Sequence, residues 1–66
     1  MTINSRKVKI ILAEKGMTQL DLSKKSGIAQ AHISSILIKG RCAIATASRI
    51  ATALEVSVSE IVEEGR

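Results

Sequence analysis

The stretch that decides the fold is residues 17–36, MTQLDLSKKSGIAQAHISSI. Thr18 and Asp21 have the spacing of a capping box, in which each side chain accepts a hydrogen bond from the backbone N–H of the other residue. A helix is therefore expected over residues 18–25, beginning at this box. Gly27 then provides the positive φ that a tight turn requires.

A second helix is expected over residues 29–38, because aliphatic side chains recur there at helical spacing. Its buried side is expected to consist of Ile33, Ile36 and Leu37. Ser23 is a small residue at the point where the two helices must approach closely. Two short helices joined so tightly cross at a steep angle and leave one side of the second exposed, which is the helix-turn-helix arrangement. An exposed helix fits the major groove of B-DNA, where its first turns reach base edges.

Further helices are expected on both sides of this motif. Apolar periodicity predicts one over residues 5–15 and another over residues 45–54, and a second capping box predicts a last short helix over residues 57–63. No segment has the alternation of a strand, and no internal repeat is present. The sequence thus predicts an all-α fold of five short helices in a single domain that covers residues 1–66.

The charge is distributed unevenly along the 66 residues. Residues 1–50 carry nine Lys or Arg against two acidic residues, whereas residues 51–66 carry one Arg against four Glu. A basic body of this kind indicates a polyanionic partner. The chain contains no Phe, Tyr or Trp, which excludes recognition of single-stranded nucleic acid by aromatic stacking.

Several other classes are excluded by the same composition. The single Cys rules out an internal disulfide and favours a reducing, cytoplasmic location. The longest early apolar run, residues 10–13, is too short to span a membrane. The only histidine, His32, has no carboxylate or thiolate at the spacing of a metal site. No metal, cofactor or small-molecule ligand is therefore expected, and no set of residues suggests an enzyme.

Residues 17–36 resemble the helix-turn-helix of the Cro/repressor (Xre-type) domains of phages and bacteria. Residues 50–62, IATALEVSVSEIV, resemble the last two helices of the same family. The resemblance implies a lambda-repressor-like fold whose second and third helices form the DNA-binding motif. It also implies a sequence-specific transcriptional regulator of double-stranded DNA, most simply a repressor, which pairs as a homodimer on an inverted-repeat operator. A Cro-like phage regulator, a restriction–modification controller and an antitoxin all remain open within this class.

The resemblance implies DNA contacts at ten positions, and Gln30 is the first of them because its amide matches the N6 and N7 groups of adenine. Gln19 matches the position that grips a phosphate and braces the recognition helix. Base-facing positions are Ala31 and Ser35, with Ala29 offering a methyl group to thymine. The remaining contacts, to the DNA backbone, are expected from His32, Ser34, Lys39, Arg41 and Arg6.

The chain departs from the family pattern at four positions. Leu12 and Leu37 replace an Arg–Glu pair, and an apolar pair can be as stable as the ion pair it replaces. Ala29 stands where a Ser or Thr normally caps the recognition helix, a loss of roughly 1 kcal/mol. Glu55 stands where Gly normally ends the fourth helix, which implies either strain or a different turn.

Four apolar residues, Leu20, Ile38, Ile10 and Ile44, are expected at the surface. They are either isolated surface residues, which are common, or contacts to a partner. The second possibility leaves an alternative function open, in which the helical fold serves as a protein-interaction module without reading DNA. The loop near Ile44 and the acidic C-terminal segment are also the expected places for a dimer contact.

Overall fold

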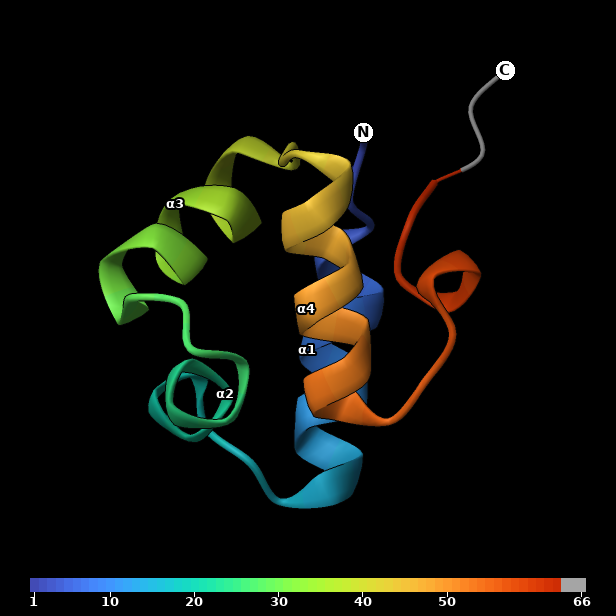
Figure 1. The fold of residues 1–66 in the computed structure, drawn as a ribbon. Helices are drawn as coiled ribbons and strands as arrows, with labels where there is room; N and C mark the ends of the chain where they lie inside the picture. Colours follow the sequence, from blue (N-terminus) through green and yellow to red (C-terminus); the bar gives the residue numbers. More distant parts are fainter. Residues whose placement is uncertain (64–66) are drawn as a thin grey trace.

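The computed structural model describes residues 1–63 and contains four α-helices followed by one turn of 3-10 helix (Figure 1). The elements are α1 (Ser5–Lys15), α2 (Gln19–Ser26), α3 (Gln30–Lys39), α4 (Ile44–Leu54) and η1 (Val58–Glu60). In Figure 1, α4 is drawn in front of α1 and both run roughly vertically, whereas α2 is seen almost end on and therefore crosses them steeply. The predicted all-α class is confirmed, and each of the first four predicted helices begins and ends within a residue or so of its predicted bounds.

The fifth predicted helix is wrong, because only a single 3-10 turn forms there. The Ser57 backbone N–H does donate to the Glu60 carboxylate, at 3.4 Å, as expected of the predicted box. After this turn the chain pairs with the N-terminal segment: the Ile61 carbonyl accepts from the Asn4 N–H at 2.8 Å, and Val62 forms an isolated antiparallel bridge with Ile3. Pairing with the N-terminal segment thus takes the backbone groups that would have continued the helix.

Local capping explains where α1 and α2 begin. The predicted box at the start of α2 is confirmed: the Asp21 N–H donates to Thr18 Oγ1 at 3.1 Å, and the Thr18 N–H donates to Asp21 Oδ2 at 3.0 Å. The Asn4 side chain caps α1 in a similar way, accepting from the Lys7 N–H at 3.0 Å. The turn after α2 contains Gly27 at φ 75°, a conformation that few other residues adopt without strain.

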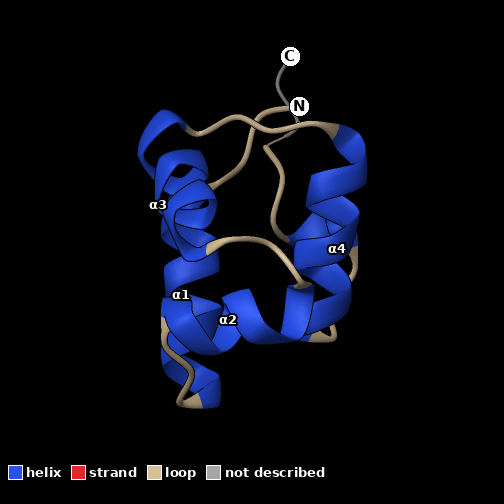
Figure 2. Cartoon of the chain, turned by 60° about the vertical axis from the view of Figure 1, so that its left-hand side comes forward, coloured by secondary structure: helices blue, strands red, loops and turns tan. Residues whose placement is uncertain are grey.

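Figure 2 shows the four helices from a second side, and a single apolar core holds them together. Its buried members are Ile3, Val8, Ile11, Leu12, Leu22, Ile28, Ile33, Ile36, Leu37, Ala47, Ile50, Ala51, Leu54 and Ile61. Among residues 1–63 no polar or charged residue is buried. Leu12 and Leu37 both belong to this core, so the expected apolar replacement of an ion pair leaves no uncompensated charge inside the fold.

The N-terminal segment ties the loop after α3 to the end of the described chain. The Ile3 N–H donates to the Gly40 carbonyl at 2.8 Å, and the Cys42 N–H donates to the Met1 carbonyl at 3.1 Å. On the other side, the Glu63 N–H donates to the Thr2 carbonyl at 3.0 Å. The loop that carries Arg41 is therefore held by backbone hydrogen bonds to residues distant in sequence. Within the described chain, no helix has the length and apolar character needed to cross a bilayer.

Candidate nucleic-acid interface

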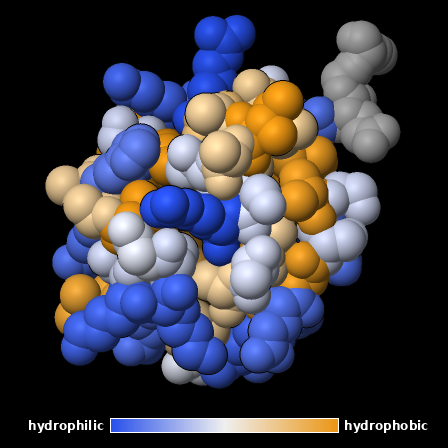
Figure 3. Space-filling view, in the orientation of Figure 1, coloured by the Kyte–Doolittle hydropathy of each residue, from blue (hydrophilic) through white to orange (hydrophobic). Residues whose placement is uncertain are grey.

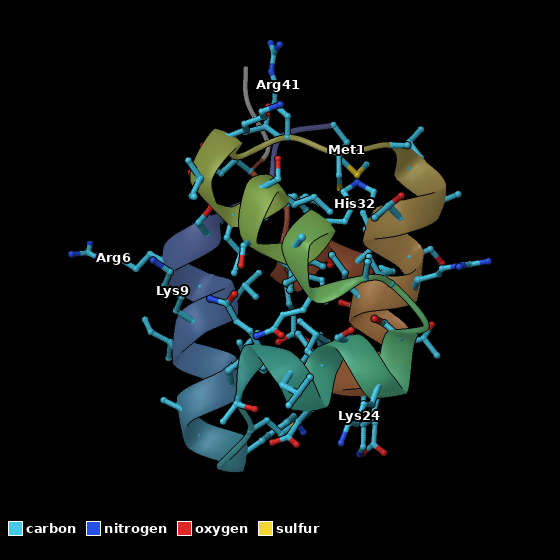
Figure 4. All side chains as sticks on the ribbon, turned by 90° about the vertical axis from the view of Figure 1, so that its left-hand side faces the viewer. Met1, Arg6, Lys9, Lys24, His32 and Arg41 are labelled. Atoms are coloured by element: carbon cyan, nitrogen blue, oxygen red, sulfur yellow. The ribbon has the colours of Figure 1, made fainter. Side chains whose placement is uncertain are left out.

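The α2–turn–α3 unit presents one side of α3 to solvent. The buried side of α3 consists of Ile33, Ile36 and Leu37, as predicted. On the other sides Gln30, Ala31 and His32 are exposed, whereas Ser34 and Ser35 are half-buried. Figure 4 looks onto this surface, with α3 in front, α2 below it and α4 to one side.

Three serine hydroxyls fix α3 against its neighbours. Ser23 Oγ donates to the Ile28 carbonyl at 2.5 Å, which closes the turn between α2 and α3. Ser34 Oγ donates to Gln19 Oε1 at 2.9 Å and so links the middle of α3 to the start of α2. Ser5 Oγ, from α1, donates to the Leu37 carbonyl at 2.6 Å near the end of α3. Helix α3 is thus held at its beginning, middle and end.

The bond between Ser34 and Gln19 also determines which polar groups are free. Because Gln19 accepts through Oε1, its amide NH₂ is left to donate elsewhere. Ser34, which was expected to lie near the DNA backbone, donates its hydroxyl hydrogen to Gln19. Gln19 is half-buried and contacts α3 through this bond, as expected of a residue that braces that helix.

The start of α3 has no side-chain cap, as the sequence predicted. Ala29 occupies the N-cap position and is exposed, and no side chain there accepts from the first-turn N–H groups. The start of α4 is equally uncapped, with Ala43 in the N-cap position. Both helices depend on tertiary packing to begin where they do.

Basic side chains surround α3, and no Asp or Glu occurs between Asp21 and Glu55. Lys39, the last residue of α3, and Arg41, two residues further on, are exposed, and Arg6 is exposed on α1. In Figure 4 the Arg6 and Arg41 side chains extend away from the body, to one side of α3 and beyond its end. The described carboxylates of the C-terminal part belong to the exposed residues Glu55, Glu60 and Glu63. This segment lies on the side of α1 and α4 opposite α3 (Figure 1), so its carboxylates lie away from α3.

The one carboxylate on α2 is already engaged. The backbone N–H of Thr18 donates to Asp21, and this hydrogen bond is the main reason that the pKa of Asp21 lies below its usual value. The Thr18 hydroxyl and the nearby Lys24 and Lys25 lower it further. Asp21 therefore remains ionised in the cap and lies beside lysines that balance its charge.

A shallow crevice of about 290 Å³ lies between the start of α3 and the first turns of α4. Its lining residues are Gly27, Ile28, Ala29, His32, Ala45, Thr46 and Arg49. His32 and Arg49 thus line the same crevice from different helices, and His32 lies between α3 and α4 in Figure 4. Arg49 was missed from the sequence because only tertiary packing brings it next to α3.

Two exposed apolar side chains border these surfaces. Ile38, in the last turn of α3, is 84% exposed, and Ile44, the first residue of α4, is 69% exposed. Leu20 and Ile10 are also exposed, as expected. Figure 3 shows hydrophilic surface over α2 along the lower edge and hydrophobic surface at the top, over the start of α4. Among residues 1–63 no three His, Cys, Asp or Glu side chains come together in a way that could hold a metal ion.

The geometry defines a helix-turn-helix protein, with a braced and exposed second helix in a basic setting. The sequence model of the Cro/C1-type HTH DNA-binding domain matches residues 7–63, which include all four helices except the first residues of α1. The chain belongs to this family and is a DNA-binding domain, which confirms the predicted resemblance. No curated protein and no solved structure matches the chain.

Proposed function

We propose that this protein is a transcriptional repressor that binds an operator in double-stranded DNA as a homodimer, with α3 of each subunit in the major groove. The observation that carries the proposal is the exposed side of α3, with Gln30 in its first turn and exposed basic residues on the elements beside it. An α-helix fits the major groove, and a glutamine amide pairs with adenine N6 and N7 through two hydrogen bonds.

The phosphates on the two sides of the groove are contacted by different elements. On one side, the free amide NH₂ of Gln19 and the Arg6 guanidinium donate to the backbone. On the other side, His32 and Arg49 form the walls of the crevice between α3 and α4. Lys39 and Arg41 act at the far end of α3. Ala29, Ala31 and Ser35 face the bases beside Gln30, with methyl or hydroxyl groups.

The dimer follows from the size of an operator. One recognition helix covers about half of a typical site, so two subunits related by a two-fold axis bind half-sites about one helical turn apart. Ile44 is exposed at the start of α4, next to the loop that follows α3. The contact is formed by Ile44 and the acidic C-terminal segment, whose described residues lie away from α3 and hence away from the phosphates.

Selection from a random duplex pool at moderate salt tests the proposal. An enriched inverted repeat with half-sites about 10 base pairs apart supports it. A pool that stays random contradicts sequence-specific regulation. On the selected operator, Gln30→Ala is expected to lose about 1–3 kcal/mol of discrimination between base pairs at one position of each half-site. Thr52→Ala, an exposed polar residue of α4, is the matched control.

A second candidate is a protein-interaction module, which the exposure of Ile38 and Leu20 favours. The salt dependence of binding separates the two. If Arg6, Lys39, Arg41 and Arg49 of both subunits each neutralise a phosphate, log K falls with log salt with a slope of about −7. An apolar protein interface has no such slope.

A further inference from the structure

The side of α3 that carries the base-facing positions continues to the end of the helix. Ile38 lies seven residues after Ala31, four after Ser34 and three after Ser35. This is the spacing of residues on one side of an α-helix. Because α3 is continuous to Lys39, the Ile38 side chain projects from the same side as these residues. It is 84% exposed, the largest exposed fraction among the large apolar side chains described.

This side of α3 has little capacity for hydrogen bonds beyond its first turn. Ala31 offers only a methyl group, and Ser34 already donates to Gln19. Ser35 is half-buried. After Gln30, the exposed side chains on this side of α3, Ala31 and Ile38, are both aliphatic. In the major groove, the apolar feature of a base pair is the C5-methyl group of thymine.

We propose that Ile38 contacts the C5-methyl group of a thymine and selects for thymine at that position of the operator. This inference rests on the DNA-binding function proposed above. The charge around Ile38 favours DNA over an apolar protein partner, since Lys39 and Arg41 are adjacent and exposed. Phosphates flank every base and compensate these charges, whereas an apolar protein surface would desolvate them without compensation.

The helix geometry sets where this thymine lies. Eight residues separate Gln30 from Ile38, which is about 12 Å along the helix axis at 1.5 Å per residue. At about 3.4 Å per base pair, a helix lying along the groove places Ile38 three to four base pairs from the pair that Gln30 reads. The operator is therefore expected to carry thymine at that distance from the adenine contact.

The test removes the apolar group from one side of the proposed contact at a time, either from the DNA or from the protein. Each thymine of the selected operator is replaced in turn by deoxyuridine, which lacks only the C5-methyl group, and binding of the wild-type protein and of Ile38→Ala is measured. Burial of one methyl group corresponds to about a fourfold change in affinity. The wild type is expected to lose about fourfold at one thymine of a half-site and about sixteenfold when both half-sites are replaced. Ile38→Ala is expected to bind the natural operator more weakly and to be insensitive to deoxyuridine at that position.

Ile10→Ala is the matched control, because Ile10 is also an exposed aliphatic residue but lies on α1. It is expected to keep the full deoxyuridine response. If Ile38→Ala kept the deoxyuridine response, the inference would be overturned while the proposed function stayed intact. The same conclusion would follow if Ile38→Ala lost affinity equally on the natural operator and on every deoxyuridine duplex. If the wild type selects no operator, the proposed function fails, and the inference fails with it.

Discussion

Glu55 holds the end of α4 in a backbone conformation that favours glycine, and replacing it provides a test of stored strain. It lies at φ 60° and ψ 41° and is the only non-glycine residue with positive φ among those described. Its N–H donates to the Thr52 carbonyl at 3.1 Å, and the Val56 N–H donates to the Ala51 carbonyl at 3.0 Å. These two bonds form a Schellman motif, in which glycine is the usual residue at this position. Of the two alternatives that the sequence left open, strain or a different turn, the backbone shows the first.

The expected gain from Glu55→Gly follows from two opposing effects. Relief of the left-handed conformation is worth roughly 1–2 kcal/mol for a residue with a Cβ atom. The greater freedom of glycine in the unfolded chain offsets about 0.4–1 kcal/mol of this. A net stabilisation of about 0.5–1 kcal/mol remains, which raises Tm by about 2–8 °C in a domain of this size. Since Glu55 is exposed, no packing is lost.

Urea and thermal unfolding followed by circular dichroism measure this gain. Glu55→Ala is the control, because it removes the same charge from the C-terminal end of α4 but keeps a Cβ atom at positive φ. It is expected to be less stable than Glu55→Gly by about 0.5–1 kcal/mol, because the same two effects apply to alanine. If the alanine variant gains as much as the glycine variant, the stabilisation comes from the charge and the helix dipole, and the strain argument is refuted.

Three further predictions concern the caps and the phosphate contacts. Ala43→Ser supplies the missing cap of α4 and is expected to stabilise the protein by about 1 kcal/mol; Ala45→Ser, inside the first turn, gives no such gain in the same unfolding assay. Because the folded pKa of Asp21 is lowered, its contribution to stability is complete above its ordinary value of about 3.9. That contribution disappears as the pH falls through the lowered folded value, so acid unfolding of the wild type is steeper than that of Asp21→Asn. Arg49→Gln is expected to reduce the salt slope of operator binding by about 2 per dimer, whereas Lys15→Gln, at the end of α1, leaves the slope unchanged.

The helix-turn-helix was predictable because its signals are local. The capping box of Thr18 and Asp21, the glycine at position 27 and the aliphatic spacing of α3 all lie within 20 consecutive residues. Each acts through hydrogen bonds or backbone preferences between near neighbours, so a single sequence is enough to recognise them. The same holds for the uncapped start of α3, which follows from an alanine at position 29.

The structural features that the sequence did not predict depend on contacts between residues far apart in the chain. The predicted fifth helix stops after one 3-10 turn because Asn4 and Ile3, almost 60 positions away, pair with Ile61 and Val62. Arg49 is 17 residues beyond His32 in the sequence, yet both line one crevice. No local sequence pattern predicts these contacts, because the pairing of distant segments depends on how the whole chain packs.

The proposed base contacts and most of the proposed phosphate contacts come from different parts of the fold. The residues proposed to contact bases, from Ala29 to Ile38, lie on one locally specified helix and its N-cap. The proposed phosphate contacts come mostly from α1, α2, α4 and the loop after α3, and only His32 and Lys39 among them belong to α3. Base contacts determine sequence preference, and phosphate contacts determine position and salt dependence. The two properties should therefore separate experimentally. Arg49→Gln is expected to lower the salt slope without altering the selected sequence, and Gln30→Ala to alter the selected sequence without changing the slope. If Arg49→Gln altered the preferred bases, the position of α3 in the groove would depend on the crevice, and base reading and phosphate binding would form one coupled site.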